Sequence, residues 1–387
     1  MTTAISSCRS ASTPSAPGRA WTARRLELSD VRCWRRGSVE LPDGLVMVVG
    51  PNGAGKTSLV EAVVLGCLGV SPRTAREAEV VRRGAQALHV TLDLDGPGGR
   101  VVREIGFEPG RGRRLRLDGE PARSLAAWRA RAVLVFLPDE LRAVKGPPAA
   151  RRRALDRVLE AASPAFADDL SGLQSALAQR NALLRRIRAG AASEATLAAW
   201  EAPIARLGAR VGAARRAGAA ALAGPFAGWF EALGGGPGGL LRLEPSPSTL
   251  AEVPDADLEE ALAAAMIERR PREIHAAQTL SGPHRDDLWI GVGEADLRRE
   301  GSQGEQRTAA LAMLLAARDH LRARAARPIL LLDDVLSELD PDRRRLLLEA
   351  VRDGGQTIVT SADPAAAAAI ASPPDGLLRV EDGQVRG

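Results

Sequence analysis

One stretch decides the fold of this chain, Gly50-Pro51-Asn52-Gly53-Ala54-Gly55-Lys56-Thr57. It fits the pattern G-x-x-x-x-G-K-[ST] of a phosphate-binding loop, or P-loop. The loop is preceded by Leu45-Val46-Met47-Val48-Val49, a short apolar run typical of a buried parallel strand. Residues 58–65 follow the loop and read as a helix. The motif is therefore predicted at a strand-to-helix junction, which is the context that it requires.

The residue types of this loop suit nucleotide binding. Glycines let backbone N–H groups turn inward around a phosphate, and the helix N-terminus adds partial positive charge. We expect Lys56 to reach the β- and γ-phosphates of ATP and the Thr57 hydroxyl to hold Mg²⁺. The chain has only one other lysine, Lys145, and uses arginine almost everywhere else. Because a tight loop needs a compact point charge, a lysine at this position indicates function rather than chance.

The composition favours a cytoplasmic protein that binds a polyanion. The 387 residues carry a net charge of +5, which favours nucleic acid or anionic lipid, although a general drift toward arginine would give the same charge. Aromatic residues make up only 3%, and there is no Tyr. The three cysteines, Cys8, Cys33 and Cys67, form no disulfide or metal-ligand spacing and suit a reducing cytosol. No apolar run approaches the ~20 residues of a membrane span, so no membrane association is expected.

Composition and pattern divide the chain into four regions. Residues 1–24 are rich in Ser, Thr, Ala and Pro, and they read as a disordered leader rather than a signal peptide. Residues 25–145 carry the P-loop and short strands, and they are predicted to form the N-terminal part of an ATPase head. Residues 146–275 read as a helical arm. Residues 276–387 are again dense in motifs and are predicted to form the C-terminal part of the head.

Hydrophobic spacing predicts the elements of the head and the arm. Alternation between residues 25 and 117 predicts an antiparallel sheet that begins with a hairpin. In the arm, the first amphipathic helix is marked by Leu170, Leu173, Leu177, Leu184 and Ile187, with Arg180, Arg185, Arg186 and Arg188 at the other positions. At about 19 residues it would span ~28 Å, far too short for a long coiled coil. A second such helix is marked by Trp200, Ile204, Leu207 and Val211.

A second chemical motif ends a predicted buried strand. Ile329-Leu330-Leu331-Leu332 is followed by Asp333 and Asp334, as in a Walker B strand. We expect Asp333 to hold the Mg²⁺ shell and Asp334 to orient or deprotonate the attacking water. The pattern is common by itself, but here it accompanies a P-loop and is followed by Ser337-Glu338-Leu339-Asp340. Asp334 and Lys56 are therefore the predicted catalytic residues.

A third motif, Ser302-Gln303-Gly304-Glu305-Gln306, opens an Ala- and Leu-rich helix and matches the signature motif of ABC-type ATPases. The free N–H groups and positive dipole of a helix start suit a γ-phosphate. In that class the motif serves the nucleotide of the other subunit, so Ser302 and Gly304 are predicted to bind a partner's ATP. Ser302 and Glu305 also fit a capping box, a structural role that is compatible with phosphate contact.

Several motifs occur in the order seen in one family. They are the P-loop, Val144-Lys145-Gly146-x-Pro148-x-x-Arg151-Arg152-Arg153, Gln179-Arg180-Asn181-x-Leu183-Leu184, Gly282-Pro283-His284-Arg285-x-Asp287, Ser302-Gln303-Gly304 and residues 332–340. Over residues 25–387 the chain resembles the RecF family of bacterial DNA replication and repair proteins. The resemblance implies an α/β fold, a P-loop NTPase head of the ABC or SMC-like type with an inserted helical arm subdomain.

The same resemblance implies a function. It implies ATP and Mg²⁺ as cofactors, an ATP-dependent homodimer, and slow, DNA-stimulated ATP hydrolysis. It implies binding to double-stranded and gapped DNA in repair, replication and the SOS response to DNA damage. It also implies RecR- and RecO-type mediators as partners in loading the recombinase RecA.

Two groups of arginines are predicted to bind DNA. Arg151, Arg152 and Arg153 follow the break at Gly146-Pro147-Pro148, and Arg185, Arg186 and Arg188 lie on the predicted arm. Contacts from such side chains to phosphates position a protein without reading sequence. The scarcity of aromatic residues disfavours a mode in which single-stranded bases stack. The alternative is that these arginines form solvated helix faces in an arginine-rich chain.

The chain departs from the family pattern at three places. Val31-Arg32-Cys33-Trp34 stands where the family usually has Phe-Arg-Asn-Tyr, so a role near the nucleotide base falls to Arg32 alone. ABC-type ATPases use a Gln after the corresponding strand, but Leu137-Pro138-Asp139-Glu140-Leu141 contains none, so an acidic side chain would take its place. Ser361-Ala362 supplies no His for the γ-phosphate. All three departures fit a weak ATPase.

Two other classes share these motifs. The ATPase subunit of an ABC transporter would have the P-loop, the signature and the Walker B strand, but the arm and Asp334, where transporters usually carry Glu, argue against it. An SMC-like chromosome clamp is disfavoured by the shortness of the arm. Stimulation of the ATPase by DNA would distinguish the first hypothesis from the transporter.

Overall fold

The structure, a computed structural model, describes residues 20–128, 133–137, 141–324, 326–364 and 372–386. Residues 1–19 of the predicted leader lie outside the described residues, as do Asp139 and Glu140. The predicted leader boundary at residue 24 is wrong, because strand β1 (Thr22–Val31) begins inside it. The reason is tertiary: the side-chain amide of Gln356 bonds both the N–H and the carbonyl of Ala23, at 2.8 Å each.

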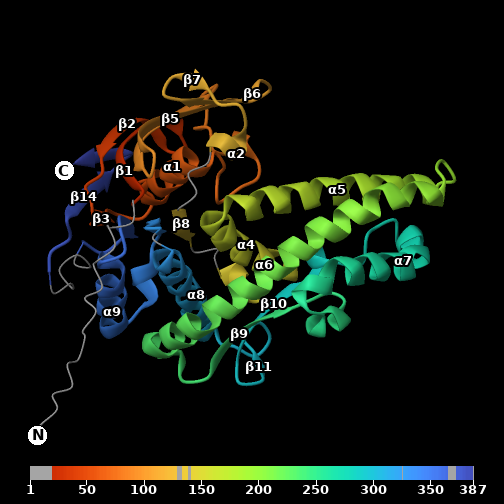
Figure 1. Ribbon diagram of the computed structural model, residues 1–387. Helices are drawn as coiled ribbons and strands as arrows, with labels where there is room; N and C mark the ends of the chain where they lie inside the picture. The colour runs from red at the N-terminus through yellow and green to blue at the C-terminus, as the bar shows by residue number, and fades with distance from the viewer. Residues whose placement is uncertain (1–19, 129–132, 138–140, 325, 365–371, 387) are drawn as a thin grey trace, which may run out of the picture.

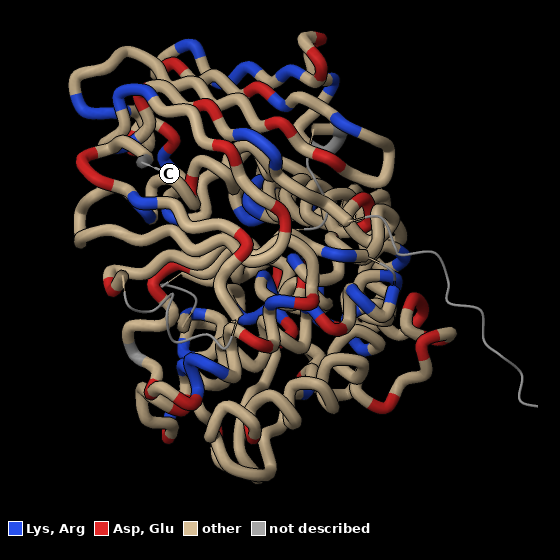
Figure 2. Tube along the Cα trace, turned by 90° about the vertical axis from the view of Figure 1, so that its left-hand side faces the viewer, with Lys and Arg blue, Asp and Glu red and all other residues tan. Residues whose placement is uncertain are grey.

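An antiparallel sheet forms one layer of the molecule (Figure 1). Its strand order is β2-β1-β4-β5-β6-β7. Besides β1, its strands are β2 (Trp34–Glu40), β4 (Leu88–Gly96), β5 (Gly99–Glu108), β6 (Gly112–Leu117) and β7 (Glu120–Pro121). The predicted hairpin is confirmed, since β1 and β2 pair antiparallel with Leu26 opposite Val39. In Figure 2 acidic and basic positions alternate along the outer strands, as expected for a solvated sheet face.

A mainly parallel sheet forms the second layer, in the order β15-β14-β3-β13-β12-β8. Its strands are β3 (Leu45–Val49), β8 (Val133–Phe136), β12 (Ile329–Leu332), β13 (Thr357–Ser361), β14 (Gly376–Glu381) and β15 (Gln384–Arg386). Strand β3 lies inside the sheet, where both faces are covered. Leu45 and Met47 point into one core cluster, whereas Val46 and Val48 point into the other. This is why the segment reads as a continuous apolar run rather than an alternating one.

Helix α1 (Lys56–Leu68) fills the space between the two sheets. It contacts β1, β4 and β5 of the antiparallel sheet as well as β8 and β13 of the parallel sheet. A helix between two layers has no solvated face, which explains why it is apolar almost all round. Its start, directly after the P-loop, is thereby held in a fixed place.

Four helices among the described residues form the arm and its base (Figure 1). They are α4 (Pro148–Ala162), α5 (Pro164–Arg188), α6 (Ala198–Phe230) and α7 (Leu258–Ala276). Helix α5 is longer than the 19 residues predicted, because it begins at Pro164 after the N-cap Ser163. The Ser163 hydroxyl accepts a hydrogen bond from the Phe166 N–H, and a proline is well tolerated at the first helical position.

The remaining elements connect the arm to the second nucleotide motif. A small antiparallel sheet, in the order β11-β10-β9, contains β9 (Gly239–Glu244), β10 (Asp287–Val292) and β11 (Ala295–Asp296). It leads into α8 (Gln303–Ala323), which packs against α6, and α9 (Pro341–Arg352) follows β12. Two short helices, α2 (Leu125–Trp128) and α3 (Arg142–Lys145), flank β8 in the chain. Short 3-10 turns fill several of the links, among them residues 283–285 and 335–338.

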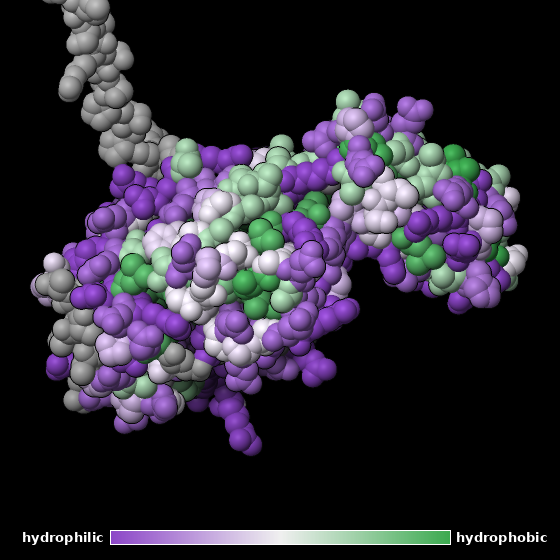
Figure 3. Space-filling model, turned by 90° about the horizontal axis from the view of Figure 1, so that it is seen from below, coloured by the Kyte–Doolittle hydropathy of each residue, from purple (hydrophilic) through white to green (hydrophobic). Residues whose placement is uncertain are grey.

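The face of the molecule that is seen from below shows no broad apolar band (Figure 3). In the view from below, apolar residues form small separate patches among hydrophilic ones (Figure 3). The large hydrophobic residues exposed within the described ranges are Leu240, Ile267 and Leu377. None of the helices described is both long enough and apolar enough to cross a membrane.

Candidate nucleotide-binding site

The P-loop forms the turn that its sequence predicts. Gly53 and Gly55 adopt positive φ angles of 82° and 111°, a region that favours glycine. Gly50 lies against β14, where a Cβ atom would come 2.1 Å from the Val380 carbonyl oxygen. The buried Ala54 carbonyl accepts a hydrogen bond from the Gly383 N–H at 3.1 Å. The loop is thus held by the C-terminal hairpin of the parallel sheet.

Lys56 folds back over this loop. Its ammonium donates hydrogen bonds to the carbonyl oxygens of Gly50 at 2.8 Å and Pro51 at 2.9 Å. Burial lowers the pKa of Lys56, although the negative charges of Asp334 and Asp333 act in the opposite direction. An ammonium that is partly desolvated and held by two loop carbonyls is placed to bind an anion entering the same loop.

The Walker B strand β12 brings its carboxylates to the start of α1. The Asp333 Oδ1 atom accepts hydrogen bonds from the hydroxyls of Thr57, at 3.1 Å, and Thr360, at 2.7 Å. Burial raises the pKa of Asp333, and these two hydrogen bonds act to lower it. Residues that are 276 positions apart in the chain therefore form one cluster with the P-loop.

Asp334 has a left-handed backbone conformation and a carboxylate oxygen without a hydrogen-bond partner among the described residues. Its φ is 50°, in the left-handed region, and its N–H donates to the Thr360 hydroxyl at 2.9 Å. Its Oδ1 atom is buried and has no hydrogen-bond partner among the described residues. A buried carboxylate oxygen without a partner is costly, so it points to a group that joins the site, such as a water.

The donor set fits Mg²⁺. Mg²⁺ is usually held by one or two protein oxygens together with substrate phosphates, rather than by a complete protein cage. The Thr57 hydroxyl and the Asp333 carboxylate supply such oxygens beside the P-loop. No cluster of three or more His, Cys, Asp or Glu residues that could hold a metal occurs in the described ranges.

One cavity of about 340 Å³ collects most of the predicted residues. It is lined by Arg32, Cys33, Asn52, Gly53, Gly55, Lys56, Thr57, Ser58, Arg73, Asp333, Asp334 and Thr360. Lys56, Thr57, Asp333 and Asp334 were predicted as ligands or catalysts, and they do lie together. Gly50 and Pro51 take part through the carbonyls that hold Lys56.

Arg32 reaches this cavity, but its guanidinium is held by protein groups. It pairs with the fully buried Glu61 through two hydrogen bonds of 2.8 Å, and it also donates to the Glu79 carbonyl at 2.6 Å. Glu61 also accepts from Arg73 at 3.3 Å. The Arg32 pKa is raised, chiefly by the hydrogen bonds to Glu61. Arg32 therefore positions the wall of the cavity as well as lining it.

Several residues that line or support the site were missed in the sequence, among them Cys33 and Ser58 of the cavity wall. Arg73 and Thr360 line the cavity, and the buried Trp34 donates its indole N–H to the Gly55 carbonyl at 3.0 Å. Gln306, the last residue of the signature motif, donates to the carbonyls of Leu297 and Gly301 and so fixes the loop before Ser302. Two features of the sequence could have indicated two of these residues. Arg73 belongs to a polar segment directly after α1, and Thr360 lies near the end of the strand that follows the Walker B strand.

Ser302 and Gly304 lie outside this cavity. Ser302 is the exposed N-cap of α8 and forms the predicted capping box with Glu305. The Ser302 N–H donates to the Glu305 carboxylate at 2.8 Å, and the Ser302 hydroxyl accepts from the Glu305 N–H at 3.2 Å. Within one chain the signature motif therefore faces solvent rather than the P-loop.

The predicted arginines of α4 divide into two kinds. Arg151 is buried, its guanidinium is paired with Asp287, and it also donates to the carbonyls of Val144 and Gly146. Its predicted contact with DNA is wrong for this structure, because tertiary partners hold the side chain inside the base of the arm. Arg152 is half-buried and donates to the Asp286 carbonyl, whereas Arg153 is exposed.

The arginines of α5 also divide. Arg185, Arg186 and Arg188 are exposed in its last turn, as the prediction requires. Arg186 and Arg188 make weak contacts with the carbonyls of Ala191 and His275, at 3.4 Å each. Arg180, predicted at a polar position, is instead completely buried. It donates to Glu273 at 2.6 Å, to the Thr279 hydroxyl at 2.9 Å and to Glu201 at 3.3 Å.

Known proteins are similar to this chain in sequence. The family model of an AAA domain matches residues 25–143. The DNA replication and repair protein RecF of Streptomyces avermitilis is 38% identical over 346 residues, 87% of this chain and 92% of that protein. The DNA replication and repair protein RecF of Heliobacterium modesticaldum is 37% identical over 369 residues, 93% of this chain and 97% of that protein.

Solved structures share the fold. The structure of the recombination mediator protein RecF with ATP in the RecFOR pathway superimposes with a TM-score of 0.85 at 24% identity, over 97% of this chain and 99% of that one. An Smc head bound to the C-winged helix domain of ScpA gives a TM-score of 0.56 at 17% identity, over 94% of this chain and 96% of that one.

Proposed function

The chain belongs to the RecF family of DNA replication and repair proteins, and from that membership and its nucleotide cavity we propose that it is an ATP-dependent DNA-binding protein that dimerises on ATP and hydrolyses it slowly. The observation that carries the proposal is the cluster of Thr57, Asp333, Thr360 and Asp334 beside Lys56 in one cavity. These are the oxygens and the charge that a bound nucleoside triphosphate with a divalent cation requires.

Hydrolysis in this site would depend on the placement of four side chains, Lys56, Thr57, Asp333 and Asp334. Lys56 exchanges its contacts with the loop carbonyls for the β- and γ-phosphates. Thr57 and Asp333 hold Mg²⁺, which when bound neutralises charge on the phosphate oxygens. Asp334 orients the attacking water and accepts its proton through the oxygen that lacks a protein partner.

The dimer is proposed from the exposed position of the signature helix. The N-terminus of α8 carries the positive end of the helix dipole, and its N-cap Ser302 is exposed to solvent. In a dimer, this helix start would meet the γ-phosphate bound by the other copy. ATP would then stabilise the pair by mass action, and removal of ATP would dissociate it.

We predict that Ser302→Arg abolishes ATP-dependent dimerisation and leaves ATP binding by the monomer nearly intact. The bulky cation blocks the other copy, while the chain's own cavity does not include Ser302. Light scattering with and without ATP measures the effect. Ser302→Ala is the control for loss of the cap, which costs about 1 kcal/mol of stability. If Ser302→Arg still dimerises with ATP, Ser302 is only a helix cap.

The proposed DNA surface contains Arg153 on α4 and Arg185, Arg186 and Arg188 at the end of α5, with Arg152 at its margin. Arg153 lies on α4 at the base of the arm, and the other three exposed arginines lie in the last turn of α5, so two closed heads could present them to one duplex. Binding through phosphates should be independent of sequence and weaken steeply with salt as counterions are released. Gapped DNA is the proposed target in the cell, with RecR- and RecO-type mediators as partners in loading a recombinase.

We predict that replacing Arg185, Arg186 and Arg188 with Ala lowers the salt slope of duplex binding by up to about 2.7, or ~0.9 per lost contact. The measurement is duplex affinity at several salt concentrations with ATP present. The control variant replaces Arg35, Arg36 and Arg114, exposed arginines of the antiparallel sheet, which removes the same charge elsewhere. Equal slopes for wild type and the arm variant would show that these arginines take no part in DNA binding. A duplex affinity that ATP does not change would contradict the binding of DNA by two heads closed on ATP.

ATPase assays with no DNA, duplex DNA and gapped DNA test the proposal as a whole. A DNA-binding ATPase should turn over ATP faster with DNA, most of all with the gapped form. The ATPase subunit of a membrane transporter shares the motifs but should be indifferent to DNA. ATP turnover that DNA does not change would reject the proposed function in favour of that class.

A further inference from the structure

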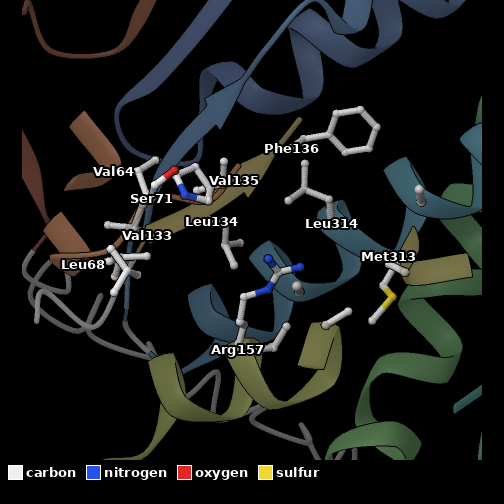
Figure 4. A pocket seen from close by; sticks show the side chains of 17 residues that line it. Val64, Leu68, Ser71, Val133, Leu134, Val135, Phe136, Arg157, Met313 and Leu314 are labelled. Atoms are coloured by element: carbon white, nitrogen blue, oxygen red, sulfur yellow. The ribbon is translucent and has the colours of Figure 1, made fainter. Parts of the chain in front are cut away.

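A second cavity lies between the two helices that begin at the nucleotide motifs (Figure 4). Its walls come from α1, the following turn at residues 70–72, β8, α3, α4 and α8. Val64 and Leu68 belong to α1, which starts at the P-loop, whereas Met313 and Leu314 belong to α8, which starts at Ser302. The cavity is separate from the nucleotide cavity, and the two have no lining residue in common.

The lining of this cavity is almost entirely apolar. Valine, leucine, alanine, proline, phenylalanine and methionine side chains supply all of it except Ser71 and Arg157. A buried water needs two to four polar partners, so such a space is poorly suited to ordered water. Apolar ligands enter poorly hydrated cavities of this kind favourably.

The cavity is also large. Its volume is about 260 Å³, whereas protein interiors contain few voids larger than one water. An apolar cavity of about 150 Å³ in another protein accommodates benzene. In proportion, this cavity has room for an apolar body of about ten carbon atoms.

Arg157 gives the cavity a charged mouth. It is an exposed residue of α4 and also a lining residue, so its side chain joins solvent to the interior. In Figure 4 the side chain extends from α4 toward the lining residues Leu134 and Leu314. A guanidinium pairs well with a carboxylate.

We propose that this cavity binds a small amphipathic molecule with an apolar body of about ten carbon atoms and one anionic group placed at Arg157. A straight-chain carboxylate of medium length has this chemistry. The ligand would lie between the C-terminal half of α1 and the middle of α8. A ligand bound in the cavity would therefore affect the movement of α1 and α8 relative to each other.

A regulatory consequence rests on the proposed function. If ATP-driven dimerisation shifts α8 relative to α1, the ligand and ATP are coupled, and each changes the affinity for the other by the same factor. A ligand that fits only the open arrangement would hold the protein in its monomeric state. The binding itself requires no such coupling and is tested first, in the absence of ATP.

The test titrates the full chain with hexanoate, octanoate, decanoate and decanol by calorimetry. Each buried CH₂ group should strengthen binding about fourfold, so decanoate should bind about 14-fold more tightly than octanoate. Arg157→Gln should weaken decanoate by up to about fivefold and leave decanol unchanged. Absence of saturable decanoate binding, or equal affinity for octanoate and decanoate, would overturn the proposal without touching the proposed ATPase.

Two variants fill the cavity. Ala317→Leu and Ala310→Leu add three carbon atoms each at buried lining positions of α8, and both should reduce decanoate affinity more than tenfold. Ala323→Leu makes the same change at an exposed position of the same helix and should bind as wild type does. Thermal unfolding confirms that each variant is folded. Wild-type decanoate affinity in a folded Ala317→Leu or Ala310→Leu variant would show that the ligand binds elsewhere.

Coupling is read from the decanoate affinity with and without a non-hydrolysable ATP analogue. A changed affinity supports the regulatory consequence. If decanoate binds with the same affinity in both conditions, the regulatory consequence is rejected, whereas the proposed binding site is supported.

Discussion

Asp334→Asn is expected to keep ATP binding and to lose about 10²- to 10⁴-fold of the ATP turnover rate, the usual contribution of a positioned general base. The Lys56 ammonium and the Thr57–Asp333 pair, which are proposed to hold the phosphates and Mg²⁺, stay in place. The lost group is the carboxylate oxygen that has no hydrogen-bond partner among the described residues. An amide in its place accepts no proton from water.

The Asn substitution also suits the backbone of this position. Asp334 has a φ of 50°, and Asn is one of the few residues that tolerates the left-handed region. Its N–H can keep the hydrogen bond to the Thr360 hydroxyl. A fall in turnover would therefore report chemistry rather than a rearranged loop.

Turnover is measured as phosphate release, and ATP binding is measured by equilibrium titration of the same variant. Asp353→Asn, which removes the same charge at an exposed position after α9, is the control and should behave as wild type does. Wild-type turnover in Asp334→Asn would mean that another residue is the base. Asp139 and Glu140, which follow β8 in the chain, would then be the first to test.

The second large effect is expected on stability. Arg180→Ala should lower the free energy of unfolding by about 3–5 kcal/mol, the usual cost of removing one partner of a buried ion pair. Glu273 is fully buried, and its other oxygen accepts only the Leu280 N–H, at 2.7 Å. Without Arg180 its charge would stay in the interior without its ion-pair partner, because Arg270, the other cation that acts on it, is paired with Glu201. Glu201 is affected less, because Arg270 also pairs with it at 2.6 Å.

Urea unfolding at equilibrium measures this loss. Arg185→Ala, on the same helix but exposed, is the matched control and should change stability by less than about 0.5 kcal/mol. The double variant Arg180→Met with Glu273→Leu should recover part of the loss, since apolar residues can replace a buried pair. A loss below about 1 kcal/mol for Arg180→Ala would show that the pair is not a main support of the arm.

Local motifs were sufficient to predict that Lys56, Thr57, Asp333 and Asp334 lie in one cavity, although other residues of that cavity were missed. The positive φ angles in the P-loop are ones that glycine adopts readily. Lys56 and Thr57 follow directly in the chain, so the local sequence places them at the loop. The capping box of Ser302 and Glu305 spans only three residues. Asp333 and Asp334 end a strand whose apolar run marks a buried parallel sheet. Each of these features depends on neighbours in the sequence, so the sequence alone indicated the fold class and the chemistry.

Burial of the arginines was decided only by the tertiary structure. Arg180 meets Glu273 across 93 positions and Arg151 meets Asp287 across 136, and nothing in the local pattern separates them from the exposed Arg185 or Arg153. The same holds for the cavity between α1 and α8, which exists because two helices that are distant in the sequence lie beside strand β8. An arginine carries a long apolar stem and five donors, so it suits either solvent or a buried carboxylate. Which of the two it meets is set by packing between elements that the sequence places far apart.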